Sequence, residues 1–204
     1  MRNIAFTFIL GLLISCNSND KRPLMGETEY QQILNASFKD ATTSPLKKKD
    51  LKNFKGLDFF PVDSSFIVLS TFTKIENSPI FKMPTNTGRE PFYKEYGVLN
   101  FTIKGKDFQL TLYQDQDETL DEKYKDDLFL PFTDKTSGNE TYGAGRYINL
   151  KTTDINPDGT FILNFNNSYN PYCAYNEKFS CPLTPRKNHL EIEIKAGIKN
   201  FKKH

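Results

Sequence analysis

The sequence has no tryptophan, two histidines and three cysteines among 204 residues, and it lacks an excess of charge of either sign. Its 27 Lys and Arg against 25 Asp and Glu argue against a dedicated nucleic-acid binder, which needs concentrated basic charge. So few cysteines exclude a disulfide-dense miniprotein. What is present, 37% hydrophobic and 14% aromatic residues, fits one globular domain of average size.

Long apolar runs are also missing, because the longest one, residues 4–14, is shorter than the roughly 20 residues that cross a bilayer as a helix. With Arg2 before it, this run predicts a signal peptide over residues 1–15. The run ends in Leu-Ile-Ser-Cys16, which resembles a bacterial lipobox and implies a lipid on Cys16, with residues 16–26 as anchor and tether. The alternatives are an ordinary cleaved signal or an uncleaved anchor. The lipid interpretation places the protein in the cell envelope, attached to a membrane and facing the periplasm or the exterior.

The other two cysteines, Cys173 and Cys181, lie eight positions apart in a chain expected to be exported. An oxidising compartment and an even count favour a disulfide between them. Free thiols are one alternative, and a metal site with His189 is another. That metal site lacks a fourth ligand and the tight spacing of structural zinc sites, so we expect neither a metal nor a cofactor.

Residues 27–204 read as a single β-rich domain. Apolar residues at helical spacing predict one short helix over residues 27–40, and Ser44-Pro45 predicts the start of a second over 46–54. Alternating runs predict strands over 66–72, 80–83, 97–103, 108–113, 128–132, 145–151, 160–165 and 190–195. Because no helical pattern separates most of these runs, we expect about eight antiparallel strands in a barrel or a sandwich.

Two turns are predicted between strands. Residues 104–107 (KGKD) have the composition of a hairpin turn. Residues 154–159 (DINPDG) match the opening of a calcium loop, but the twelfth position is Phe165 where an EF-hand has a glutamate. A proline-containing turn explains the same residues and is favoured.

Polar residues gather in two segments, 132–147 and 165–175. In the first segment, Gly143 and Gly145 permit a close approach of another chain or a ligand to the backbone. Arg146, which follows them, offers a guanidinium group that can bind a carboxylate or phosphate. In the second, asparagines and tyrosines suit a sugar or another polar ligand. The alternative for the first segment is that the glycines form a β-bulge and the arginine makes a structural salt bridge. The alternative for the second segment is that the asparagines form turns. The residues selected as ligand-binding candidates are Thr141, Tyr142, Arg146, Asn166 and Asn170.

A hydrolase acting on envelope glycan or ester is the competing hypothesis. It would use Asp134, Glu140 and His189, because a base within hydrogen-bond reach is what such chemistry needs. The sequence has no Gly-x-Ser-x-Gly elbow and no His-Glu-x-x-His motif. A surface or capping role for His189 is the alternative.

Several ordered motifs, among them GNETYGAGRY (138–147), YNPYCAY (169–175) and SCPL (180–183), resemble the bacterial domain-of-unknown-function family 1684. The resemblance covers residues 30–199 and implies a small secreted or lipid-anchored protein, without supplying an activity. Asn164 and Ile198 stand where the family pattern often has acidic residues, which argues against an enzyme here. We therefore expect a monomeric envelope protein that binds a small polar or anionic ligand in a polar cleft, or one that maintains the envelope. A purely structural interaction protein is a third possibility.

Overall fold

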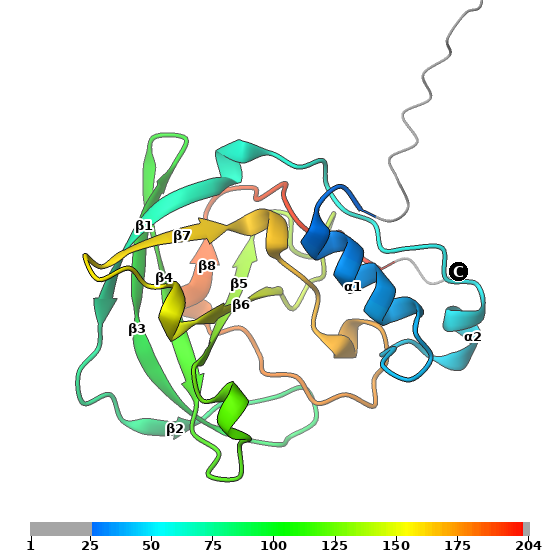
Figure 1. Cartoon of the computed structure of the whole chain (residues 1–204), viewed down its shortest axis with the longest axis horizontal. Coiled ribbons are helices and arrows are strands. Elements are labelled where there is room, and N and C mark those ends of the chain that lie inside the picture. Colours follow the sequence, from blue (N-terminus) through cyan, green and yellow to red (C-terminus); the bar gives the residue numbers. More distant parts are fainter. Residues whose placement is uncertain (1–25, 202–204) are drawn as a thin grey trace, which may run out of the picture.

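The computed structural model describes residues 26–201, and it is mainly antiparallel β-structure with two α-helices (Figure 1). The predicted signal peptide and Cys16 lie outside these residues. The eight strands are β1 (Ile67–Lys74), β2 (Ile80–Lys82), β3 (Phe92–Ile103), β4 (Lys106–Asp115), β5 (Asp127–Asp134), β6 (Arg146–Lys151), β7 (Thr160–Asn164) and β8 (His189–Leu190). Seven of them match predicted strands to within a few residues, β3 being the most extended.

The strands form one curled sheet in the order β6-β5-β4-β3-β1-β7, with β2 added to β3 and β8 to β5. This half-barrel replaces the predicted closed barrel or sandwich, because β6 and β7 remain at the two ends of the order. The reason lies at the outer edge of β6. There the backbone groups of Tyr147 exchange hydrogen bonds of 2.9 Å with those of Tyr169, so the edge pairs with a later segment of chain and not with β7.

The two predicted turns are confirmed. Lys104 and Gly105 have φ values of +49° and +73°, the conformation of a two-residue hairpin loop between β3 and β4. In the 154–159 loop, the Gly159 N–H donates to the Asn156 carbonyl at 2.8 Å, and the Asp158 carboxylate accepts from the Thr160 N–H at 2.8 Å. A turn therefore accounts for these residues.

The main core fills the concave face of the sheet with aliphatic and phenylalanine side chains from every long strand. A smaller cluster lies beside it, where α1 (Glu29–Lys39) packs Phe38 against Tyr175 with ring centroids 4.7 Å apart. Thr28 caps α1 by accepting a hydrogen bond from the Gln31 N–H. The helix therefore lies over the 169–182 segment, where the candidate site is found (Figure 1).

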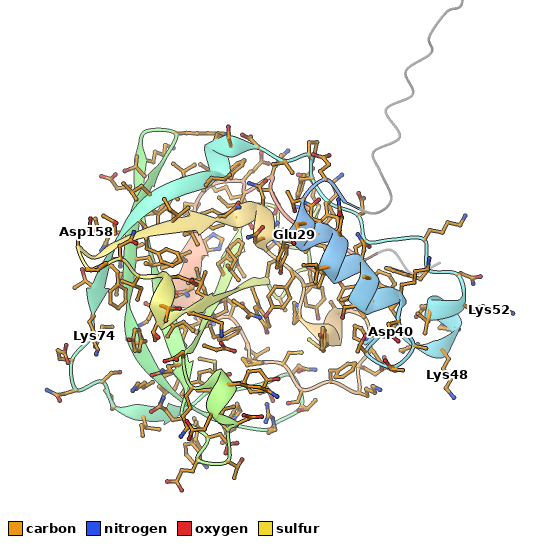
Figure 2. All side chains as sticks on the ribbon, viewed as in Figure 1. Glu29, Asp40, Lys48, Lys52, Lys74 and Asp158 are labelled. Atoms are coloured by element: carbon orange, nitrogen blue, oxygen red, sulfur yellow. The ribbon has the colours of Figure 1, made fainter. Side chains whose placement is uncertain are left out.

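The second helix is shorter than predicted. The α2 helix covers Lys48–Lys52, and the Ser44 hydroxyl accepts from the Leu46 N–H in a turn before it, without capping the helix. Lys48 and Lys52 are exposed and point away from the body of the protein, as expected for a solvated face (Figure 2). Within residues 26–201, no helix is long and apolar enough to span a bilayer.

The last predicted strand, 190–195, is wrong for most of its length. Only His189–Leu190 pairs with the sheet, in parallel with Thr133 and Asp134 of β5. Beyond Leu190 the chain no longer pairs with β5. The carbonyls of residues 194, 196 and 198 instead accept hydrogen bonds from the buried side chain of Arg146.

Candidate functional site

Arg146, Asp134 and the backbone of residues 194–198 form a buried ionic clasp, with Arg146 at its centre. The guanidinium donates to the Asp134 carboxylate at 2.8 Å, and to the carbonyls of Ile194 at 2.8 Å and Ala196 at 2.5 Å. Its side chain is 0% exposed and lies over the Phe132 ring, 5.1 Å from the centroid. Burial lowers the pKa of Arg146, and the neighbouring Asp134 charge opposes this shift.

The Asp134 carboxylate is satisfied on its other side as well. Its Oδ1 atom accepts from the Thr136 N–H at 2.8 Å, from the Thr136 hydroxyl at 2.6 Å and from the Ile194 N–H at 3.2 Å. The Thr136 hydroxyl also lies 2.8 Å from that of Thr141. A buried ion pair of this kind is sustained by the additional hydrogen bonds around it. Arg146 thus fastens the C-terminal segment to the sheet, and Thr141 supports the turn that holds Asp134. The salt-bridge alternative explains the arginine.

The two asparagine candidates have the same kind of role. Asn166 accepts from the Asp63 N–H at 3.1 Å and donates to the Asp63 carbonyl at 3.0 Å, as a neighbouring strand would. The Asn170 amide donates to the Lys199 carbonyl at 2.9 Å. Both side chains are 1% exposed. Of the five candidate residues, only Tyr142 is half-buried, and the other four face the interior and not a cleft.

The proposed hydrolytic residues do not converge. His189 lies 2.9 Å from the Thr133 hydroxyl and 3.2 Å from the Glu191 carboxylate, and it is partly exposed. Thr133 and Asp134 are consecutive in a strand, so their side chains point to opposite faces of the sheet. Glu140 pairs with Lys195 at 3.1 Å on the surface. Each group has a different partner, and the arrangement offers no shared base and nucleophile.

The predicted disulfide is wrong, because Cys173 and Cys181 are both free thiols. They are nevertheless neighbours, since the Cys173 N–H donates to the Cys181 sulfur at 3.2 Å. Asn86 holds Cys181 in place, accepting its N–H at 2.7 Å on the side chain and donating a backbone bond of 3.2 Å to its carbonyl. His189 belongs to the Thr133 region and does not complete a metal site. Over residues 26–201, no cluster of three or more His, Cys, Asp or Glu could hold a metal.

A tyrosine cleft of about 440 Å³ opens beside these cysteines. It lies where α1, the outer face of β6 and the 169–182 segment meet (Figure 1). Its lining comprises Tyr30, Leu34, Tyr147, Asn149, Tyr169, Pro171, Tyr172, Phe179, Ser180, Cys181 and Pro182. No acidic or basic side chain is among these residues. The cleft therefore combines aromatic faces with neutral hydrogen-bonding groups.

The rings of the cleft hold one another in edge-to-face pairs. Tyr147 and Tyr169 have centroids 5.8 Å apart and planes at 89°, and Tyr172 and Phe179 have centroids 5.3 Å apart at 61°. The Tyr169 hydroxyl donates to the Asn149 amide oxygen at 2.6 Å, which fixes that ring. Burial raises the pKa of Tyr147 and Tyr169, so both phenols stay neutral at physiological pH.

The sequence pointed to only part of this cleft. Segment 165–175 was selected, and it supplies Tyr169 and Tyr172. Segment 132–147 ends at Tyr147, but neither Tyr147 nor Asn149 is among the selected binding candidates. Alternation along β6 puts both on the face opposite Arg146 and Ile148, a signal that the strand pattern contains. Tyr30 comes from α1, more than a hundred residues earlier, and only the packing of that helix brings it to the cleft.

The family model described as "protein of unknown function (DUF1684)" matches residues 52–199, so the chain belongs to this family. Among solved structures, the protein resembles an uncharacterized protein of Haloarcula marismortui determined by solution NMR. The two are 32% identical with a TM-score of 0.65, over 83% of this chain and 89% of the other. No curated protein matches.

Proposed function

We propose that the protein is a binding module of the cell envelope that takes small, uncharged, ring-containing ligands, neutral sugars above all, in the tyrosine cleft. The observation that carries the proposal is the lining: a cleft of about 440 Å³ with four tyrosines, one phenylalanine and no charged side chain. Ligand sites of this size are mostly apolar and aromatic, with a few polar groups for orientation.

The chemistry of the lining favours a neutral ligand over the anionic one considered from the sequence. Arg146, the group expected to bind an anion, is fully buried and its two terminal nitrogens already donate to Asp134 and backbone carbonyls. A charged ligand entering the cleft would lose hydration without gaining a counter-charge. A sugar ring can instead place its C–H face on a tyrosine ring and its hydroxyls against phenol and amide groups.

The test is calorimetric titration of the full chain with a panel of neutral disaccharides, chitobiose and cellobiose among them, and with glucose 6-phosphate as the charged comparison. We expect a neutral sugar to bind and the phosphate ester not to bind. Tyr172→Ala should weaken binding about tenfold, or roughly 1.4 kcal/mol. Tyr172 is suited to this test because it is 40% exposed.

The matched control is Tyr124→Ala, because Tyr124 is 47% exposed and does not line the cleft. It should leave the affinity unchanged. Preference for the phosphate ester, or equal loss of binding in the two variants, would contradict the proposal.

Attachment to a membrane through Cys16 is part of the same proposal, supported by the lipobox-like end of the apolar run. Expression of the full chain with labelled palmitate should label the wild-type protein and place it in the membrane fraction. Cys16→Ser should abolish the label and release the protein. Labelling that persists in Cys16→Ser would refute attachment at this residue, and it would leave the cleft hypothesis unaffected.

A further inference from the structure

Building on the proposed sugar-binding function, we propose that the tyrosine cleft continues past Asn149 into a second subsite, and that the ligand is a neutral oligosaccharide long enough to fill both. This second subsite, the asparagine pocket, has a volume of about 370 Å³. Its polar lining residues are Asn149, Asp154, Asn156, Asn164 and Asn167. Both volumes are at the lower end of the range for ligand sites, about 300–1,000 Å³, so each subsite holds part of a longer chain.

The asparagine pocket lies between β6 and β7, which are consecutive in the chain but stand at opposite ends of the strand order. The 152–159 connection joins them without pairing them (Figure 1). The backbone groups of Tyr147 point to the outer edge of β6, where they bond to Tyr169, and alternation directs those of Asn149 to the same edge. Within residues 26–201 these Asn149 groups have no backbone partner, so an N–H and a carbonyl face the pocket.

Asn149 joins the two subsites because it lines both of them and is exposed. The Tyr169 hydroxyl donates to the Asn149 Oδ1 atom at 2.6 Å, which orients the amide and leaves its Nδ2 group for a ligand. Tyr169 is itself part of the cleft lining. A sugar chain bound on the tyrosine rings therefore meets a fixed amide donor where it enters the pocket.

The other asparagines of the pocket also use only part of their hydrogen-bonding capacity within the protein. The Asn164 Oδ1 atom accepts from the Asn166 N–H at 3.0 Å, and the Asn156 Nδ2 group donates to the Thr160 hydroxyl at 2.9 Å. In the described part of the chain, Asn164 Nδ2, Asn156 Oδ1 and the whole Asn167 amide have no partner. An amide held on one side offers its other side to a ligand, and sugar hydroxyls can both donate and accept.

The charge of the asparagine pocket matches a neutral ligand. Asp154 accepts from the Lys151 N–H at 2.7 Å, and a carboxylate has further capacity to accept from sugar hydroxyls. The Lys151 ammonium instead pairs with Asp127 at 2.9 Å, and no basic side chain lines the pocket. An anionic sugar would lose hydration there without gaining a counter-charge, as in the tyrosine cleft. The two subsites thus select the same class of ligand.

The experiment is calorimetric titration of the full chain with chitobiose and chitotetraose, and with cellobiose and cellotetraose. For the sugar type that binds, we expect the tetrasaccharide to bind about tenfold more tightly than the disaccharide, a gain that about two added hydrogen bonds supply. Equal affinity for the two lengths would overturn the second subsite and leave the tyrosine cleft as a sugar site. Absence of binding by all four sugars would refute the proposed function, and the second subsite with it.

Asn167→Ala locates the added sugar units, because this side chain lines the pocket and has no partner among the described residues that the substitution would disturb. It should remove the advantage of the tetrasaccharide and leave the affinity for the disaccharide unchanged. Tyr172→Ala should weaken both, since Tyr172 lines the cleft alone. The matched control is Asn53→Ala, an exposed asparagine outside both subsites, which should change neither affinity. A tetrasaccharide advantage that survives Asn167→Ala would overturn the assignment.

Nuclear magnetic resonance tests the same point without a substitution. The side-chain amide signals of Asn149, Asn164 and Asn167 should all shift when the tetrasaccharide binds to the wild-type chain. The disaccharide should shift the Asn149 signal and leave the other two in place. Tetrasaccharide shifts that spare Asn164 and Asn167 would overturn the second subsite.

Discussion

The ionic clasp and the tyrosine cleft lie on opposite faces of β6, and they use polar residues in opposite ways. Arg146 points inward, is 0% exposed and has its charge matched by Asp134 and three carbonyl groups. Tyr147, the next residue, belongs to the outer face and lines a cleft without any charged side chain. One step along a strand therefore separates a group used for stability from a group available to a ligand.

This difference shows that the residue type does not decide the role. Arginine is the side chain best suited to anion recognition, yet here its donors bond to the protein's own backbone. Tyrosine commonly fills cores, yet four tyrosines leave an open volume. The decisive quantity is exposure: the Arg146 guanidinium is fully buried and bonds to Asp134 and backbone carbonyls, whereas the tyrosine rings line an open volume.

The largest expected effect comes from breaking the clasp. Arg146→Met should lower the free energy of unfolding by about 3–5 kcal/mol, because it leaves the Asp134 charge buried without its partner. Urea denaturation monitored by circular dichroism measures this loss. The control is Lys151→Met in the same strand, which removes an exposed 2.9 Å pair with Asp127 and should leave the unfolding midpoint nearly unchanged, because exposed pairs contribute little to stability. Equal effects of the two substitutions would show that the clasp contributes no more than a surface pair.

A smaller effect is expected where the clasped segment approaches the 165–168 turn. Gly197 has φ +72°, and a Cβ there would lie 2.1 Å from the Ser168 hydroxyl and 2.7 Å from the Phe165 carbonyl. Gly88 has a similar φ of +82° with open space around it. Gly197→Ala and Gly88→Ala should each lower the free energy of unfolding by about 1–2 kcal/mol through backbone strain. Only Gly197→Ala should add a further ~1–3 kcal/mol of overpacking, measurable as a lower unfolding midpoint. Similar midpoints would mean that the contact relaxes freely.

Exposed aromatic side chains of the tyrosine cleft should contribute little to the stability of the fold. Tyr172→Ala should change the free energy of unfolding by less than ~1 kcal/mol, because the side chain is 40% exposed. Tyr175→Ala, three residues on, should lose about 3–5 kcal/mol, since that ring is 1% exposed and packs against Phe38. Chemical denaturation of both variants makes the comparison. A large loss in Tyr172→Ala would mean that the cleft is part of the core.

Local rules were enough to predict much of the fold. The Lys104-Gly105 loop and the alternation on either side of it fixed the β3–β4 hairpin, because the turn residues and the period agree there. The same alternation failed over 190–195. The pattern is real, but residues 194–198 meet a guanidinium donor from β6 in place of a neighbouring strand. Long-range side-chain-to-backbone bonds leave no periodic signal in a sequence.

None of the five residues selected from the sequence as ligand-binding candidates lines the tyrosine cleft. Segments 132–147 and 165–175 do contain the groups that surround the cleft and the clasp. Composition alone could not show that Asn166 bonds to Asp63, about a hundred residues away, and so faces inward. It also could not show that Tyr30 of α1 completes the lining. These placements depend on how α1 and the 165–182 segment pack on the sheet.

The smallest effect concerns the cysteines, where the cleft meets the interior. The pKa of Cys173 is lowered to about 7 because it accepts the Cys181 hydrogen bond, whereas donating that bond and burial raise the pKa of Cys181. Because the thiolate is the reacting form, alkylation of Cys173 by iodoacetamide should be half-maximal near pH 7, below the ~8.5 of an ordinary thiol. Cys181 should stay unreactive over the same range. Peptide mass spectrometry of the Cys16→Ser chain distinguishes the two residues. Equal rates for both, rising together near pH ~8.5, would show that no proton is shared between the sulfurs.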